Sequence, residues 1–181
     1  MSIITSSWAD PWGGVHQNVL HFSCSNITFV GTGKDTTTIL GGFAIYNFEN
    51  ITFKNMTVTN TSGRGIIMKN AKVELVDVAL KRCRSACLRI HILISSSETT
   101  LVATRCEFAN SGVGVFVTGS SNSATFNNCV FHDNRFHGIQ GENRATIHLH
   151  GEATAVHSNE NRGISTYSSA KVLIHLPSHH N

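Results

Sequence analysis

The fold is decided by the stretch from Cys106 to Ile139, which reads CEFANSGVGVFVTGSSNSATFNNCVFHDNRFHGI. A C-x-F phrase, a turn carrying Asn or Asp and a Gly-rich return occur twice in it, at an interval of 23 residues. Cys129 therefore repeats Cys106, and Phe131 repeats Phe108. Because stacked coils place like residues at a fixed interval, this repeat predicts a solenoid of parallel strands.

The same spacing continues on both sides of that stretch. A first-strand position is followed five residues later by a second-strand position in four coils, at Ile51 and Met56, Val73 and Val78, Leu101 and Cys106, and Ala124 and Cys129. Inward-facing partners are expected two residues further on in both strands. The third strand returns, usually behind a glycine, at Ile66, Leu88, Val115 or Phe116, Ile139 and Ile164. We expect an all-β solenoid of about six or seven coils, with Phe108 and Phe131 buried against each other.

One domain is expected, because 181 residues suffice for one substantial core and not for two of ordinary size. Residues 1–25 show no clear period, and Pro11 with two glycines behind it marks a loop, so we interpret them as an N-terminal lead-in or cap. Residues 26–176 are predicted to form the solenoid. Residues 177–181 are interpreted as the tail of a truncated solenoid. We expect its open ends to be covered by the tail, by further sequence or by another subunit.

An antiparallel β-sandwich is the structural alternative, since it also has short alternating strands and frequent turns. Hairpins do not require the same residue type at the same offset every 22 to 28 residues, whereas stacked parallel coils do. Helices are disfavoured because Thr, Val, Ile, Asn and Gly dominate and no period of about 3.6 residues persists. The segment 79–92 has moderate helix propensity, but it fits the coil count better.

Composition excludes several classes of partner. The formal charge of +3 comes from scattered Lys and Arg without a run, so we expect no nucleic acid partner. No apolar run approaches the roughly 20 residues of a membrane span, and the N-terminus shows no signal-peptide pattern. Five cysteines leave at least one thiol unpaired within the chain. Cys106 and Cys129 would stack in neighbouring coils, where a disulfide is conceivable and a buried pair of thiols is commoner.

Asparagines occur in two patterns. N-x-Ser/Thr sequons at Asn26, Asn50, Asn55 and Asn60 suggest an extracellular or cell-surface protein. The same tripeptides arise wherever a strand follows an Asn turn, and this structural interpretation is the stronger one. A second set falls at or next to the second bend of successive coils, at Asn60, Asn110, Asn134 and Asn159. Asn tolerates the left-handed conformation of a sharp bend, and stacked amides hydrogen-bond one another, so we expect structural roles.

Two sets of residues carry a family resemblance. They are NITFVGTGKDTTTI, from Asn26 to Ile39, which looks like a usual first coil, and the N-x-F/V-x-x-N-x-x-G-I phrases at 128–139 and, more loosely, 154–164. From Asn26 to its end, the chain resembles the right-handed parallel β-helix superfamily, the pectin-lyase-like fold. Repeats of this kind serve lyases, hydrolases, epimerases, esterases, adhesins and metal-delivery proteins alike, so function has to be argued from a site.

In that superfamily the substrate groove usually follows the outward face of the first strands. The candidates for carbohydrate binding on this face are Thr52, Lys54, Glu74, Thr125, Asn127, His148 and His150. Glu74 is the only acid expected there, whereas lyases of this fold hold calcium with several carboxylates and hydrolases use a pair. We therefore expect no cofactor and assign no catalytic residue.

Histidine is concentrated toward the C-terminus, with nine of the eleven residues after position 90. His148 and His150 share one face of a strand, and an offset of 25 residues places His175 beside His150 in the next coil. The same offset stacks His157 on His132. Exposed His rows are tolerated on any β surface, and no carboxylate supports this one. We therefore expect no bound metal, with His148, His150 and His175 as the candidate ligands if there is one.

Two functions remain after these exclusions. The favoured hypothesis is a non-catalytic β-helix module that presents a flat Thr/Asn/His surface to carbohydrate or protein. The alternative is a polysaccharide-active enzyme, lyase-like or epimerase-like, or a fragment of one, with an acid/base pair drawn from Lys54, Glu74, Arg89 and the histidines. A groove with convergent charged groups favours the enzyme, and a flat face favours the module.

Overall fold

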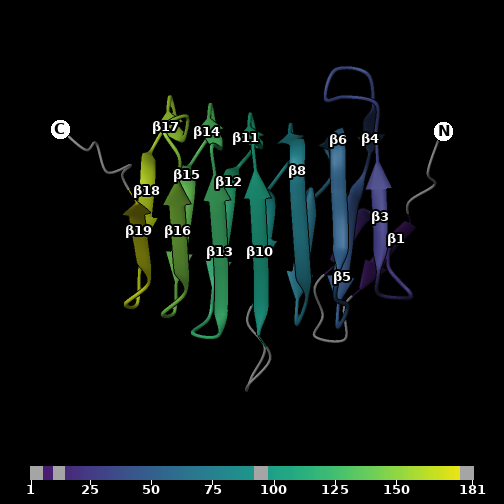
Figure 1. The fold of residues 1–181 in the computed structure, drawn as a ribbon, viewed down its shortest axis with the longest axis horizontal. Helices are drawn as coiled ribbons and strands as arrows, with labels where there is room; N and C mark the ends of the chain where they lie inside the picture. Colours follow the sequence, from purple (N-terminus) through teal and green to yellow (C-terminus); the bar gives the residue numbers. More distant parts are fainter. Residues whose placement is uncertain (1–5, 10–14, 92–97, 176–181) are drawn as a thin grey trace.

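The computed structural model describes residues 6–9, 15–91 and 98–175, which form about seven turns of a right-handed β-helix (Figure 1). Each full turn contributes a first, a second and a third strand, joined by three bends. Strands and turns make up the described residues, and no helix among them is long and apolar enough to cross a membrane. The predicted fold class is confirmed.

The first and second strands of successive turns form one sheet. Its strands are β3 (Ile27–Val30), β4 (Thr38–Leu40), β6 (Ile51–Thr59), β8 (Lys72–Lys81), β10 (Thr99–Thr104), β11 (Glu107–Ala109), β13 (Asn122–Asn127), β14 (Val130–His132), β16 (Thr146–His150), β17 (Ala155–His157) and β19 (Lys171–His175). β6 and β8 are long because each passes through the first bend and supplies both strands of its coil.

The third strands form the other sheet. Its strands are β1 (Ser6–Ala9), β2 (Val15–His21), β5 (Gly42–Tyr46), β7 (Ile66–Lys69), β9 (Ala86–Ile90), β12 (Val113–Thr118), β15 (His137–Glu142) and β18 (Arg162–Thr166). Of the described strands, only β1 and β2 pair antiparallel, and all pairing between coils is parallel, which excludes the β-sandwich. β2 pairs in parallel with β5, so the solenoid sheet begins within the residues interpreted as a lead-in.

The pairing register follows the count made on the sequence. First strands align at Ile51, Val73, Leu101 and Ala124. In the third strands the inward position is Val115, which pairs with Ile139, while Phe116 faces outward beside Arg89. The ambiguity at this position has a physical cause. The second bend of this coil, at Gly112, is one residue shorter than in the coils on either side.

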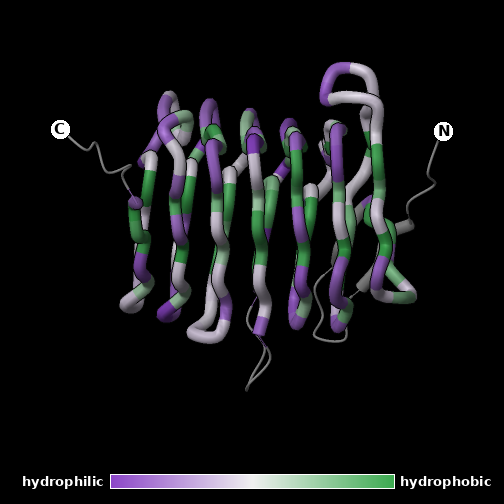
Figure 2. The backbone as a smooth tube through the Cα atoms, viewed as in Figure 1, coloured by the Kyte–Doolittle hydropathy of each residue, from purple (hydrophilic) through white to green (hydrophobic). Residues whose placement is uncertain are grey.

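Apolar side chains that alternate with polar ones along the strands form the core (Figure 2). Phe108 and Phe131 have no exposed surface, and their rings stack with centroids 5.1 Å apart, as predicted. Phe126 meets both rings edge-on. A second aromatic cluster in the first coils consists of Phe22, Phe29, Phe43 and Phe53. Aromatic pairs therefore join neighbouring coils inside the solenoid.

Most first and second bends are tight, and the third is variable. The first bend is longer in two coils, where seven residues separate β3 from β4 and four separate β16 from β17. At the first bends one residue has a positive φ, and these residues are Asn55, Asp77, Arg105, Asn128 and Gly151. At the second bends the residues with a positive φ are Arg82, Asn110, Asp133 and Ser158. The third bend, between a third strand and the next first strand, differs in length. Two residues separate β7 from β8, whereas eight separate β9 from β10.

Buried amides connect the second bends. Asn134 is fully buried, and its Nδ2 donates to Asn159 Oδ1 at 2.9 Å, while its Oδ1 accepts the Ser111 N–H at 3.2 Å. Asn60 is buried too, and its Nδ2 donates to a backbone carbonyl four residues ahead. Asn110 takes the neighbouring positive-φ position instead. The predicted hydrogen bond between stacked amides is thus present between Asn134 and Asn159.

The five cysteines are free thiols, and all except Cys24 are buried. The Cys106 backbone N–H lies 3.4 Å from Cys129 Sγ, so the two thiols stack in neighbouring coils. The Cys129 thiol, together with burial, raises the pKa of Cys106. The structure therefore has the pair of buried thiols and not the disulfide, the commoner of the two alternatives that the sequence left open.

The C-terminal edge of the described solenoid leaves apolar side chains open. β17, β18 and β19 each pair on one side only within the described residues. Ile174 of β19 is 60% exposed, and Leu173 is 40% exposed. The tail predicted at 177–181 lies outside the described residues, and the covered end remains a prediction.

Candidate functional site

The residues predicted to bind carbohydrate lie in two rows on the outer face of the first strands. One row contains Thr52, Glu74, Val102, Thr125 and His148, and the other contains Lys54, Val76, Thr104, Asn127 and His150. Strand β10 therefore separates the candidates on β6 and β8 from those on β13 and β16. None of the predicted residues lines either of the two grooves described below. The carbohydrate candidates therefore lie on one face of the solenoid, but outside both of these grooves.

The acid/base set suggested for an enzyme does not converge. Lys54 and Glu74 lie in the first-strand sheet, whereas Arg89 lies on β9 in the third-strand sheet. Thr52 Oγ1 donates a hydrogen bond to Glu74 Oε2 at 3.5 Å. A proton transfer between Arg89 and either of the other two residues has no geometric basis.

Three of the histidines do converge. His150 and His175 stack with ring centroids 4.0 Å apart and an interplanar angle of 5°. His148 Nδ1 lies 3.0 Å from His175 Nε2, and one ring nitrogen of each residue lies within 4.8 Å of the other two. Burial, followed by the other two imidazoles, lowers the pKa of His150. Within the described residues, no carboxylate belongs to this cluster.

A groove of about 550 Å³ opens on the outer face of the third strands, where the sequence predicted no site. Four arginines line it, namely Arg64, Arg84, Arg89 and Arg135, and its described lining holds no carboxylate. Arg64 precedes β7, Arg89 lies on β9, and Arg135 precedes β15. Because β12 lies between β9 and β15, the guanidinium groups span four successive coils and follow the solenoid axis.

The groove has a structural cause at Gly112. The second bend of this coil is one residue shorter than its neighbours, and Gly112 carries no side chain. Its N–H donates to the Ser85 carbonyl at 2.7 Å, which draws the backbone close to the previous coil. A Cβ at this position would lie 2.8 Å from Ser85 O. Arg84 and Arg135 therefore lie on either side of a hollow at Gly112, which the side chain of a larger residue would fill.

Two of the arginines lie over aromatic rings. Arg89 Cζ is 4.8 Å from the centroid of Phe116, and Arg135 Cζ is 5.2 Å from that of Phe136. Burial, and then the positive charge of Arg64, lowers the pKa of Arg89. Arg89 Nε is buried without a hydrogen-bond partner, and no described carboxylate lies within salt-bridge distance of Arg89 or Arg135. Arg89 is therefore partly dehydrated, with the charge of Glu142 acting on it only from beyond salt-bridge distance, whereas Arg135 is exposed to solvent. Both guanidinium groups favour an anionic ligand.

A second groove of about 600 Å³ adjoins the first and shares Arg84 and Arg135 with it. Its lining also contains Arg82, Asp133 and Glu160. Charges of both signs therefore meet at the second bends, while the first groove remains purely basic.

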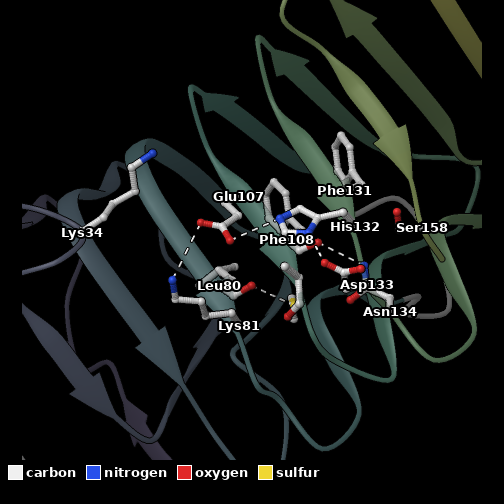
Figure 3. A network of polar contacts seen from close by, with 12 residues as sticks. Lys34, Leu80, Lys81, Glu107, Phe108, Phe131, His132, Asp133, Asn134 and Ser158 are labelled. Atoms are coloured by element: carbon white, nitrogen blue, oxygen red, sulfur yellow. Dashed lines mark hydrogen bonds and ion pairs between the residues drawn. The ribbon is translucent and has the colours of Figure 1, made fainter.

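Asp133 links the second groove to a chain of polar contacts on the outer face of the second strands (Figure 3). Lys81 Nζ lies 3.9 Å from Glu107 Oε2, and Glu107 Oε1 lies 3.3 Å from His132 Nε2. His132 Nδ1 lies 2.6 Å from Asp133 Oδ2. His132 also stacks on His157 with centroids 5.2 Å apart, as predicted. His132 is thus held between two carboxylates, a partnership that the sequence did not indicate.

The sequence contained a signal for the arginine groove, but not as a run of basic residues. The four arginines fall at or just before the third strands of three coils, with Arg84 and Arg89 in the same coil, and no two of them are adjacent in the chain. Laying the coils over one another places Arg89 beside Phe116, and places Arg84 and Arg135 on either side of Gly112. A charge count made along the solenoid axis would have identified this patch.

Comparison with known proteins agrees with the parallel coils of the structure. The family model described as right handed beta helix region matches residues 16–176. No curated protein and no solved structure matches the chain. Since the matched region covers most of the chain, this protein belongs to the right-handed beta helix family.

Proposed function

We propose that this protein is a non-catalytic β-helix module that binds an acidic polysaccharide through the arginine groove. The observation that carries the proposal is a groove lined by four arginines and by no described carboxylate. Guanidinium groups pair bidentately with carboxylate and sulfate groups, and such charge-assisted hydrogen bonds are stronger than neutral ones. An acidic ligand therefore supplies negative charges that the described lining of the groove does not.

The direction of the groove favours a polymer over a small anion. Arg64, Arg89 and Arg135 belong to different coils, and neighbouring coils repeat at about 4.8 Å along the axis. A chain with an acidic group on each sugar can follow this axis and meet a new guanidinium after one or two coils. The rings of Phe116 and Phe136 line the same groove and offer apolar faces for sugar rings.

The absence of a carboxylate from the described lining supports binding without turnover. Hydrolysis of a glycosidic bond requires a pair of carboxyl groups, and the described lining of the arginine groove offers none. Elimination by lyases of this fold needs several carboxylates to hold calcium against the acidic sugar, and these are missing from the same lining. This supports the module over both kinds of enzyme.

A second candidate function, a polysaccharide-active enzyme, rests on one observation. His132 is held by Asp133 at 2.6 Å and by Glu107 at 3.3 Å, and Asp133 lines the second groove. A histidine positioned by carboxylates is the arrangement that general base catalysis uses. Turnover of a polysaccharide that disappears in His132→Gln would favour this candidate.

Binding is tested with polygalacturonate, dextran sulfate and neutral dextran, by affinity electrophoresis and calorimetry of the full chain. We expect both acidic polymers to bind and dextran not to bind, with affinity falling as salt is added. Arg135→Gln removes an exposed side chain, so it should leave the thermal midpoint unchanged. It should weaken binding about 10- to 100-fold, because a hydrogen bond to a charged group contributes about 1.5–3 kcal/mol.

Lys54→Gln is the control, because it removes one half-buried cation from the first-strand face. We expect it to bind like the unmodified protein. Loss of binding in Lys54→Gln, with Arg135→Gln unaffected, would move the site to the face predicted from the sequence. Equal binding of dextran and polygalacturonate would contradict the electrostatic basis of the proposal.

A further inference from the structure

The three converging histidines occupy the last two first strands that the structure describes. His148 and His150 are two residues apart on β16, so the period of a strand puts both side chains on its outer face. His175 of β19 pairs directly with His150. β16 and β19 are in register over five residue pairs, which fixes the three Cα positions relative to one another.

The nitrogen atoms already lie near the separation that a shared metal ion requires. Ligand atoms of a tetrahedral zinc site, with Zn–N bonds of about 2.0–2.1 Å, are about 3.3 Å apart. His148 Nδ1 and His175 Nε2 are 3.0 Å apart, and all three ligand nitrogens lie within 4.8 Å of one another. Because the rings of His150 and His175 are stacked, rotation of their side chains has to turn the nitrogen lone pairs toward a shared ion, while the paired backbones of β16 and β19 keep their register.

The surroundings select the kind of ion. Asn127 pairs with His150 and Leu173 pairs with His148, so the nearest residues across the sheet are uncharged. No described carboxylate joins the cluster. Imidazole donors suit zinc, copper and nickel, whereas magnesium and calcium require oxygen ligands. Since His175 is exposed, a fourth coordination position remains open to water.

We propose that His148, His150 and His175 form a binding site for one divalent transition metal ion of the zinc or copper class, with an open fourth position. The bound ion joins β16 to β19 and so fastens the last described coil to the one before it. The site lies in the first-strand sheet and shares no residue with the arginine groove. Its occupancy is therefore measured independently of polysaccharide binding.

Titration of the full chain with zinc chloride at neutral pH, followed by calorimetry, tests the site. We expect one ion per chain, a rise in the thermal midpoint with zinc and no binding of magnesium. Cobalt(II) used as a probe should show the visible absorption of a four-coordinate ion. His150→Asn should weaken zinc binding at least about tenfold and abolish the rise in the midpoint.

Two control variants separate this site from the other histidines. His157→Asn alters the stacked pair with His132 on the second strands, and His179→Asn combined with His180→Asn alters the C-terminal tail. Both should bind zinc like the unmodified protein. The proposal is overturned if the tail variant loses zinc while His150→Asn keeps it, if His157→Asn weakens binding as much as His150→Asn, or if the unmodified protein binds no zinc.

Discussion

Phe131→Ala is expected to destabilise the solenoid by about 3–5 kcal/mol. The Phe131 ring is fully buried, stacked on Phe108 at 5.1 Å and met edge-on by Phe126 at 5.1 Å. Truncation removes the burial of the ring, and it removes two aromatic contacts that contribute about 0.5–1.5 kcal/mol each beyond burial. Parallel pairing holds Phe131 to Phe108 and to Val156 on either side, so the backbone cannot close over the cavity. We therefore expect a loss in the upper half of the range.

Urea unfolding followed by circular dichroism measures this loss, with two matched variants. Phe131→Leu keeps most of the volume and should cost less than about 1.5 kcal/mol. Phe136→Ala removes a ring that is 48% exposed, and it should cost less still. The slope of the transition has to agree between variants before the free energies are compared. If Phe131→Ala lost no more stability than Phe136→Ala, the ring would not be part of the core and the stacked-coil account would be wrong.

Three further predictions concern other parts of the chain. Asn134→Ala should cost about 1–3 kcal/mol in urea unfolding, because the buried Ser111 N–H loses its acceptor; an unchanged midpoint would contradict the role of the amide. Burial, and then the charge of Arg162, lowers the pKa of His137 from its ordinary value of about 6.5. The unfolded chain therefore binds more protons, stability falls as the pH drops below about 6.5, and His137→Gln should flatten this slope in stability measured against pH. Ile174→Lys should reduce concentration-dependent association in light scattering, because it places a charge on the open edge; equal scattering of variant and parent would count against association there.

The fold could be predicted because the repeat constrains it at every coil. The offset of five residues between first and second strands gave the register at Ile51, Val73, Leu101 and Ala124 directly. The single ambiguity, at Val115, arose where the second bend loses one residue, and counting alone cannot locate such a deletion. The histidine cluster followed from the same arithmetic, because strand pairing carries a sequence offset into space.

A charge count along the solenoid axis would have found the row of arginines, but the groove that they line could not be predicted in the same way. Its position depends on the shortened bend at Gly112, which opens a hollow between Arg84 and Arg135, and on the outward orientation of Phe116 beside Arg89. Both are consequences of the register that was ambiguous in the sequence. The face chosen for the candidate site came from the resemblance to a superfamily rather than from these residues, and a shared fold does not fix which face is used.

The unequal bends make this chain a scaffold whose connections can change length while the stacked strands keep their positions. The second bend at Gly112 is one residue shorter than its neighbours, and seven residues separate β3 from β4 at the first bend of its coil, yet the inward positions on both sides stay aligned with the next coil. The third bend already ranges from two residues between β7 and β8 to eight between β9 and β10, while the strands on both sides stay in register. Ser120 and Ser121, exposed between β12 and β13, offer such a place. A foreign loop grafted there would stand out from a rigid stack, and relatives of this chain would be expected to acquire length, and new binding loops, at such bends and not within the strands.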